Sequence, residues 1–86
     1  MKFKEINGKL ELNIRFDTFL AVLDFIQEAG HIMESQKHHA DIMINYTKVK
    51  LTLCTHDAGN AITNKDRILA GEIEIMLESY STAVAG

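Results

Sequence analysis

The sequence of 86 residues is long enough for one small domain, and we predict a single domain over residues 1–86. Hydrophobic residues make up 47% and charged residues 24% of the chain, which excludes a disordered or fibrous protein. Nine Lys and Arg against twelve Asp and Glu give a net charge of −3, which argues against a protein that binds nucleic acid directly. The single cysteine excludes an internal disulfide. Because so small a domain has a thin core, we expect copies of the chain to associate.

No apolar stretch is long enough to span a membrane. The N-terminal segment MKFKEINGKLELNIRF alternates charged and apolar residues and lacks the hydrophobic core of a signal peptide. We therefore expect a cytoplasmic protein that does not contact membranes.

The first elements are predicted to form a β-hairpin. Met1–Ile6 alternates loosely, Asn7-Gly8 is the preferred residue pair of a two-residue turn, and Lys9–Phe16 alternates cleanly. In the second strand every other residue is apolar, so one face is expected to be buried and the other to face water.

The pattern then changes to the period of a helix, with Asp17 as the predicted N-cap. The apolar stripe consists of Phe19, Val22, Leu23, Ile26, Ala29 and Met33. Gly30 leaves two alternatives: the helix ends at Ala29 with Gly30 as its C-cap, or it continues to about Gln36. Because the stripe extends to Met33, we favour the longer helix, in which Gly30 would admit a close neighbour.

A second hairpin and a second helix follow. We predict strands over residues 42–46 and 49–56, joined by a turn at Thr47-Lys48, and then a loop over Asp57–Thr63. Thr63 and Asp66 have the spacing of a capping box at the start of the last helix. The predicted apolar face of this helix is Leu69, Ile73, Met76, Leu77 and Tyr80, and the residues predicted to face water are Glu72, Glu74 and Glu78. The tail Ser79–Gly86 is expected to fray.

The element order ββαββα predicts an α+β fold, a four-stranded antiparallel sheet with two helices packed on one face. Open edges of such a sheet are a second reason to expect oligomers.

The candidate chemistry lies in the histidines. His38 and His39 directly follow the first helix, and His56 follows the last predicted strand. Residues at the ends of elements converge on clefts, and imidazoles exchange protons near neutral pH, so the three side chains suit general acid–base catalysis. The alternatives are structural: the adjacent pair can interact with the dipole of its helix, and His56 can simply end a strand.

Two other kinds of site are less well supported by the pattern. His38, His39 and His56 with Glu34 or Asp57 could bind zinc, but adjacent histidines project differently and no HExxH spacing occurs, so we predict no metal site. The predicted strands are rich in basic residues: Lys2, Lys4, Lys9, Arg15, Lys48 and Lys50. Without tryptophan or a set of stacking aromatics, these residues are better explained by a solvated sheet face.

Several of these residues occur together in a recognisable order. The stretch ESQKHHA from Glu34 to Ala40, then Tyr46, then Thr55-His56-Asp57, then Asp66 resembles the signature of the pterin-4a-carbinolamine dehydratases. The resemblance extends over about Leu10 to Tyr80. The helix that usually precedes the first hairpin in this family, with its tryptophan, has no counterpart in the sequence.

The resemblance implies an enzyme, a 4a-hydroxytetrahydrobiopterin dehydratase of the hydro-lyase class. Such an enzyme converts 4a-hydroxytetrahydropterin (pterin-4a-carbinolamine) into quinonoid dihydropterin and water, in the recycling of tetrahydropterin. The pterin is the substrate, and no cofactor is expected. The residues implied are His38, His39 and His56 as catalytic groups, and Glu34, Thr55, Asp57 and Asp66 as substrate-binding groups. Within this set, His38 and His56 would be the proton-donating pair, and His39 would position the pterin.

The sequence also departs from the family pattern. Ala40 replaces the usual proline, Lys37 occupies a position that is often acidic, and the segment between His56 and Asp66 is one residue longer than its commonest form. The resemblance also leaves a second function open, a non-catalytic binding or assembly protein with a protein partner. This would be a dimerisation cofactor or a chaperone-like scaffold. In either case the family implies a homodimer or homotetramer.

Overall fold

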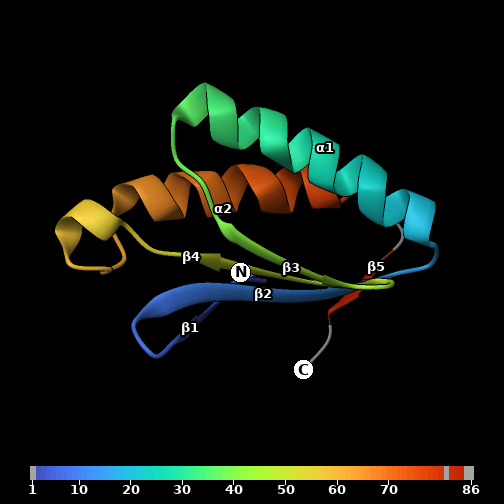
Figure 1. The fold of residues 1–86 in the computed structure, drawn as a ribbon, viewed down its shortest axis with the longest axis horizontal. Coiled ribbons are helices and arrows are strands. Elements are labelled where there is room, and N and C mark those ends of the chain that lie inside the picture. Colours follow the sequence, from blue (N-terminus) through green and yellow to red (C-terminus); the bar gives the residue numbers. More distant parts are fainter. Residues whose placement is uncertain (1, 81, 85–86) are drawn as a thin grey trace.

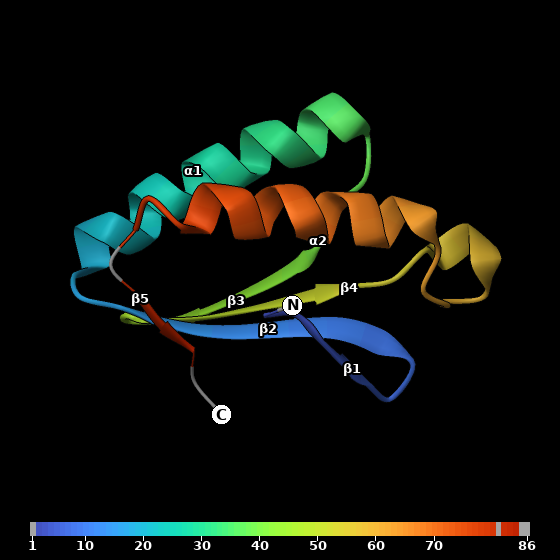
Figure 2. The ribbon, with the colours of Figure 1, turned by 180° about the vertical axis from the view of Figure 1, so that it is seen from behind.

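The computed structural model describes residues 2–80 and 82–84 and confirms the predicted α+β architecture (Figure 1). Its elements are β1 (Lys4–Ile6), β2 (Lys9–Phe16), α1 (Phe19–Gln36), β3 (Asp41–Asn45), β4 (Lys48–Leu53), the 3-10 helix η1 (His56–Ala58), α2 (Asn64–Leu77) and β5 (Thr82–Val84). Both α-helices cover the same face of the sheet, as predicted, and the two opposite views show the other face without a helix (Figures 1 and 2).

The sheet is antiparallel, with strand order β1-β2-β4-β3 and β5 paired with β2. β4 occupies one edge of β2 over Leu10–Arg15. β1 pairs with Lys9–Glu11 and β5 pairs with Ile14–Phe16, so these two short strands share the other edge of β2. β3 is therefore the strand at the far edge of the sheet.

The first hairpin forms where the sequence places it. Asn7 and Gly8 have φ angles of 52° and 76°, the left-handed conformation that both residues of a type I′ turn require. β1 begins at Lys4, while the prediction began the strand at Met1, which lies outside the described residues. Phe3 is buried, and its backbone N–H donates a hydrogen bond of 2.8 Å to Glu74 Oε2. The prediction that Glu74 faces water is therefore wrong, because the carboxylate ties the N-terminal segment to α2.

α1 continues to Gln36, which confirms the longer of the two predicted helices. Its N-cap is Thr18, whose Oγ1 accepts a hydrogen bond of 3.1 Å from the Ala21 N–H, so the prediction of Asp17 was wrong by one residue. The predicted reason for Gly30 is also wrong, because a Cβ built there would meet no atom within 4 Å.

The buried stripe of α1 is Val22, Phe25, Ala29 and Met33. The sequence pattern missed Phe25 and assigned Phe19 and Leu23 to the core, but these two side chains are 42% and 45% exposed. The helix is therefore rotated about its axis relative to the prediction, and part of its apolar surface faces away from the sheet.

The core lies between the sheet and the helices. Its sheet side comes from alternate residues of β2 and β4, and α2 contributes Leu69, Ala70, Ile73 and Leu77. At one end Phe16, Phe25 and Tyr80 form an aromatic cluster, with the Tyr80 ring edge-on to both phenylalanines at centroid distances of 5.9 Å and 5.8 Å. Edge-to-face geometry is favourable for aromatic rings, so this cluster fixes the end of α2 against α1 and β2.

Three boundaries in the second half differ from the prediction. The hairpin turn is Tyr46-Thr47 instead of Thr47-Lys48, because Asn45 pairs with Lys48 and Tyr46 adopts a φ of 56°. β4 ends at Leu53, and His56 begins η1 instead of ending a strand. The expectation that the tail frays is wrong for Thr82–Val84, which form β5; Ser81, Ala85 and Gly86 lie outside the described residues. Within the described ranges, no helix is long and apolar enough to cross a membrane.

Candidate active site

The candidate site lies at one end of the molecule, where α1 ends, β4 ends and α2 begins (Figure 1). A hollow of about 300 Å³ opens there. Its lining residues are Lys37, His38, His39, Ala40, Asp41, Thr55, His56, Asp57 and Lys65. The fold therefore brings the His38–His39 pair and His56 together around one space, although they are separated by two strands in the sequence.

The end of α1 fixes the backbone of His38. Lys37 adopts a left-handed conformation with a φ of 54°, and its N–H donates to the Glu34 carbonyl. The His38 N–H donates to the Met33 carbonyl at 3.0 Å. These two bonds are those of a Schellman motif, which usually has glycine at the left-handed position. The motif turns the chain sharply, so that His38 points back toward the start of α2.

His38 is held by a buried carboxylate. Its Nε2 lies 2.5 Å from Asp66 Oδ1, and the Asp66 side chain is fully buried. The other oxygen, Oδ2, accepts hydrogen bonds from Thr55 Oγ1 at 2.8 Å and from the Thr63 N–H at 2.9 Å. Burial acts to raise the pKa of the Asp66 carboxyl, but the hydrogen bonds from His38, Thr63 and Thr55 outweigh it and hold the pKa below its ordinary value. Asp66 is thus an ionised group behind His38 and also caps α2, as the sequence predicted.

His39 has a different environment. Its Nε2 is hydrogen-bonded to Glu34 Oε2 in the preceding helix. The side chains of this pair are 58% and 77% exposed, so the contact lies in water at the mouth of the hollow. An exposed pair of this kind contributes little to folding stability.

His56 is oriented by a residue that the sequence pattern did not single out. Its Nδ1 lies 2.7 Å from Asn60 Oδ1. Gly59 and Asn60 both have left-handed φ angles, 70° and 61°, which turn the chain back after η1 and bring the amide beside the ring. Because a carbonyl oxygen only accepts hydrogen bonds, Nδ1 carries the proton, and Nε2 of the neutral ring is an acceptor.

The three histidines share one arrangement. One nitrogen of each ring is hydrogen-bonded to an oxygen atom of another side chain: His38 to Asp66, His39 to Glu34 and His56 to Asn60. Over residues 2–80 and 82–84, the second ring nitrogen makes no hydrogen bond to the protein. The oxygen fixes the tautomer, and the second nitrogen is left to exchange a proton with a ligand.

Five of the seven site residues predicted from the sequence line the hollow: His38, His39, Thr55, His56 and Asp57. Glu34 and Asp66 do not line the hollow but are the hydrogen-bond partners of His39 and His38. Asp41 and Lys65 also line the hollow and were not among the predicted site residues. Lys65 could have been found, because it lies within the first turn of α2, next to the capping residue Asp66.

Metal binding is another chemistry that three neighbouring histidines could support. In the described part of the chain, no group of three or more His, Cys, Asp or Glu side chains is arranged to hold a metal ion.

Fold and site together define a small α+β protein with a histidine-lined hollow at one end of its sheet. The family model of pterin 4 alpha carbinolamine dehydratase matches residues 2–76, so the chain belongs to this family. A relative from Picosynechococcus, named "Putative pterin-4-alpha-carbinolamine dehydratase", is 36% identical over 73 residues, which cover 85% of this chain and 78% of that protein.

Solved structures show the same fold. A transcriptional coactivator/pterin dehydratase from Brucella melitensis has a TM-score of 0.80 at 22% identity, over 86% of this chain and 80% of that one. A pterin dehydratase-like protein, described as a RuBisCO assembly factor in the alpha-carboxysome, has a TM-score of 0.75 at 18% identity, over 94% of both chains.

Proposed function

We propose that the protein dehydrates a 4a-hydroxytetrahydropterin to the quinonoid dihydropterin and water. The observation that carries this proposal is the convergence of His38, His39 and His56 on one hollow, each with a ring nitrogen available to a ligand. Membership of the dehydratase family supports the choice of a pterin as substrate.

The reaction needs an acid and a base. The C4a–O bond breaks as the hydroxyl takes up a proton and leaves as water, and N5 loses its proton as the C4a=N5 double bond forms. No electrons enter or leave, so the reaction requires no redox cofactor. We assign proton transfer to His38 and His56, which both line the hollow, and positioning of the pterin to His39.

The hydrogen-bond partners suggest how the two roles divide. The ionised Asp66 carboxylate can stabilise positive charge on the His38 ring, which suits the group that delivers a proton to the leaving hydroxyl. Asn60 is neutral and accepts from Nδ1 of His56, which leaves the lone pair on Nε2 to receive the N5 proton. Thr55 and Asp57 lie beside His56 at the lining, where they can hydrogen-bond the edge of the pterin ring.

The decay of 4a-hydroxytetrahydropterin at near-neutral pH tests this proposal. We expect the protein to accelerate the decay, and we expect His38→Ala and His56→Ala each to lower the rate by about 10² or more. His31→Ala is the matched control, because His31 is an exposed histidine of α1 that does not line the hollow. Decay no faster than in buffer, or equal rates for all three variants, would overturn the proposal.

A binding or assembly role is the second candidate. The observation that favours it is an exposed apolar surface beside the edge strand β3, formed by Phe19, Leu23, Ile42, Ile44 and Tyr46, each at least 41% exposed. The similarity in fold to a protein described as a RuBisCO assembly factor points in the same direction. Such a surface marks a contact with another protein chain.

We also propose that copies of the chain form a homodimer or homotetramer. Light scattering, which measures the oligomer, and the decay assay, which measures turnover, together separate the two candidate functions. An enzyme loses turnover on mutation of His38 and keeps its oligomer. A scaffold shows no turnover in the wild type, and its assembly is impaired by Leu23→Asp and unaffected by His38→Ala.

A further inference from the structure

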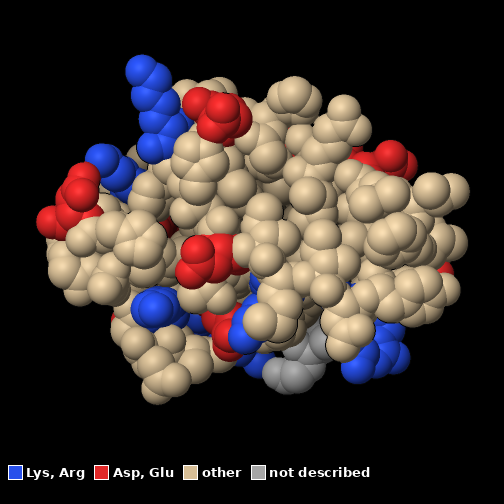
Figure 3. Space-filling model, in the orientation of Figure 1, with Lys and Arg blue, Asp and Glu red and all other residues tan. Residues whose placement is uncertain are grey.

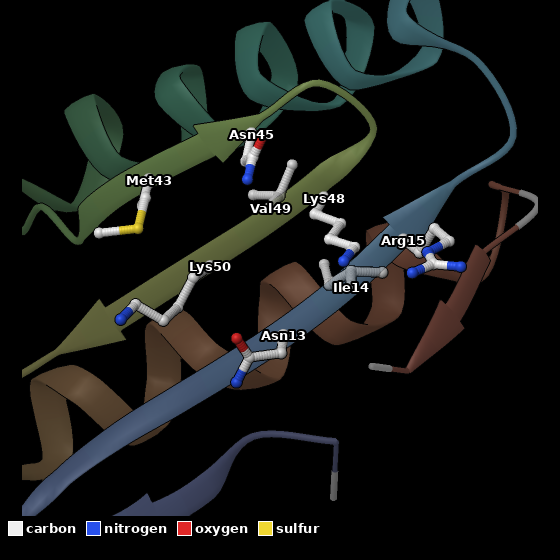
Figure 4. A pocket seen from close by; sticks show the side chains of 8 residues that line it. All are labelled: Asn13, Ile14, Arg15, Met43, Asn45, Lys48, Val49 and Lys50. Carbon is white, nitrogen blue, oxygen red and sulfur yellow. The ribbon is translucent and has the colours of Figure 1, made fainter. Parts of the chain in front are cut away.

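The face of the sheet that no helix covers carries a second hollow, of about 560 Å³ (Figure 4). It lies across β2, β4 and β3 near the β3–β4 turn, and its polar side chains point away from the helices. The lining residues are Asn13, Ile14, Arg15, Met43, Asn45, Lys48, Val49 and Lys50. Ile14 and Val49 turn their side chains into the core, so their backbone forms the floor.

The register of the strands places cations side by side in this hollow. Arg15 of β2 lies directly opposite Lys48 of β4, and Lys50 lies two residues along from Lys48. Like charges opposite each other in an antiparallel pair destabilise a sheet. In the described residues no carboxylate lies within 4.0 Å of the charged groups of Arg15 or Lys48, and Lys50 has only a long contact of 3.7 Å with Glu11.

Polar and apolar groups complete the hollow. Asn45 is paired with Lys48 and Asn13 with Lys50, so a carboxamide stands beside each lysine. Met43, opposite Lys50 on the edge strand, is 58% exposed and provides an apolar contact. The space-filling view shows Lys and Arg side chains along the lower side of the molecule, where the sheet lies (Figure 3).

We propose that this hollow binds a small molecule that carries two or more linked phosphate groups. The guanidinium of Arg15 and the ammonium group of Lys48 have no carboxylate within 4.0 Å among the described residues, and Lys50 has only the 3.7 Å contact with Glu11. Flanked by amide donors, these three cations match the oxygens of a phosphate chain. Alternate residues of a strand are about 7 Å apart, which is more than one phosphate group spans, so Lys48 and Lys50 together favour a diphosphate or triphosphate. Met43 can contact the organic part of such a molecule.

Nucleic acid fits the same surface less well. No aromatic side chain lines the hollow, so bases would have no stacking platform, and the net charge of the chain is −3. The cations are also confined to one end of the face. Two residues further along β4, Thr52 pairs with Glu11 of β2 and Asp41 of β3, so acidic residues follow the cations.

The test is a titration of the ¹⁵N-labelled protein with inorganic pyrophosphate, followed by backbone amide shifts. We expect saturable shifts centred on Arg15, Lys48 and Lys50, weaker binding of inorganic phosphate, and loss of affinity as salt is added. Lys48→Gln is expected to weaken pyrophosphate binding about tenfold. Lys9→Gln is the matched control, because Lys9 lies on the same face of β2 but outside the hollow.

Three results would overturn the inference: no saturable shift at millimolar pyrophosphate, equal weakening by Lys48→Gln and Lys9→Gln, or a single-stranded oligonucleotide that binds the same residues more tightly than pyrophosphate. The variants do not touch the histidine-lined hollow, so dehydratase turnover is expected to be unchanged in both. Loss of this site and failure of the proposed catalytic function are therefore separate outcomes.

Discussion

The Nε2 atom of His38 lies 2.5 Å from Asp66 Oδ1, and this carboxylate is fully buried. The contact joins the end of α1 to the start of α2, since Asp66 also accepts from the Thr63 N–H at the N-cap. A single side chain therefore caps a helix, links two elements and supports a candidate catalytic group.

We predict that Asp66→Asn destabilises the protein by about 3 kcal/mol at neutral pH, because it removes a buried carboxylate that accepts hydrogen bonds from His38, Thr55 and Thr63. The pKa of Asp66 is below its ordinary value of 3.8 in the folded protein. The stabilisation is therefore fully present above about pH 4 and is lost as the pH falls through the lowered pKa. Urea denaturation of both proteins as a function of pH checks this: the difference should shrink in acid.

Asp24→Asn is the control, because Asp24 is exposed on α1 and should change stability by less than about 0.5 kcal/mol. A difference between wild type and Asp66→Asn that stayed constant down to the most acidic pH would contradict the role of the ionised carboxylate.

The hydrogen bond between Asn60 and His56 predicts that Asn60 fixes the tautomer of the His56 ring. Asn60→Gly keeps the left-handed backbone accessible and removes the oxygen that accepts from Nδ1. We expect kcat to fall about tenfold with little change in KM, since the ring loses its fixed tautomer but remains at the lining. The ¹⁵N shifts of the ring nitrogens should change from one tautomer to a mixture.

Asn60→Asp is the matched variant, because it retains an accepting oxygen and should retain the Nδ1–H tautomer. An unchanged tautomer in Asn60→Gly would show that His56 is oriented by something else.

The turn of the first hairpin and the start of α2 could be predicted because short-range signals determine them. Asn7-Gly8 specifies its turn, and the spacing of Thr63 and Asp66 specifies the start of α2. The capping residue of α1 was missed because Asp17 and Thr18 are adjacent and both suit an N-cap; only the hydrogen bond to Ala21 distinguishes them. β5 was missed because its pairing with β2 connects the two ends of the chain.

The site could be predicted in its residue types but not in its contacts. His38, His39 and His56 follow from position and from the family signature. The partnership of His38 with Asp66 spans 28 residues and depends on how α1 packs against α2. The role of Asn60 depends on its left-handed backbone, a conformation that the sequence DAGN leaves open.

Lys37 occupies the left-handed position of the Schellman motif, where a side chain with a Cβ is strained. We predict that Lys37→Gly stabilises the protein by about 0.5–1 kcal/mol, because the native conformation costs glycine almost nothing. Gln36→Gly, one residue earlier and inside α1, should instead destabilise by about 1 kcal/mol. Thermal unfolding of the two variants measures both signs, and destabilisation by Lys37→Gly would contradict the argument.

The environment of Tyr80 predicts a change in stability at alkaline pH. Its ring packs edge-on against Phe16 and Phe25, and its hydroxyl donates a hydrogen bond to Glu28. Burial, and then the hydrogen bond to the Glu28 carboxylate, raise the pKa of the Tyr80 hydroxyl from 10.0 to about 12. Because this pKa is higher in the folded protein, the stabilisation is present below about pH 10 and is lost as the pH rises toward 12.

The phenolate absorbance of the folded protein should contain a component that titrates near pH 12 and is missing in Tyr80→Phe. Glu28→Gln keeps an accepting oxygen without the charge, so it should lower this titration toward the ordinary value. An unchanged titration in Glu28→Gln would assign the whole shift to burial in the aromatic cluster.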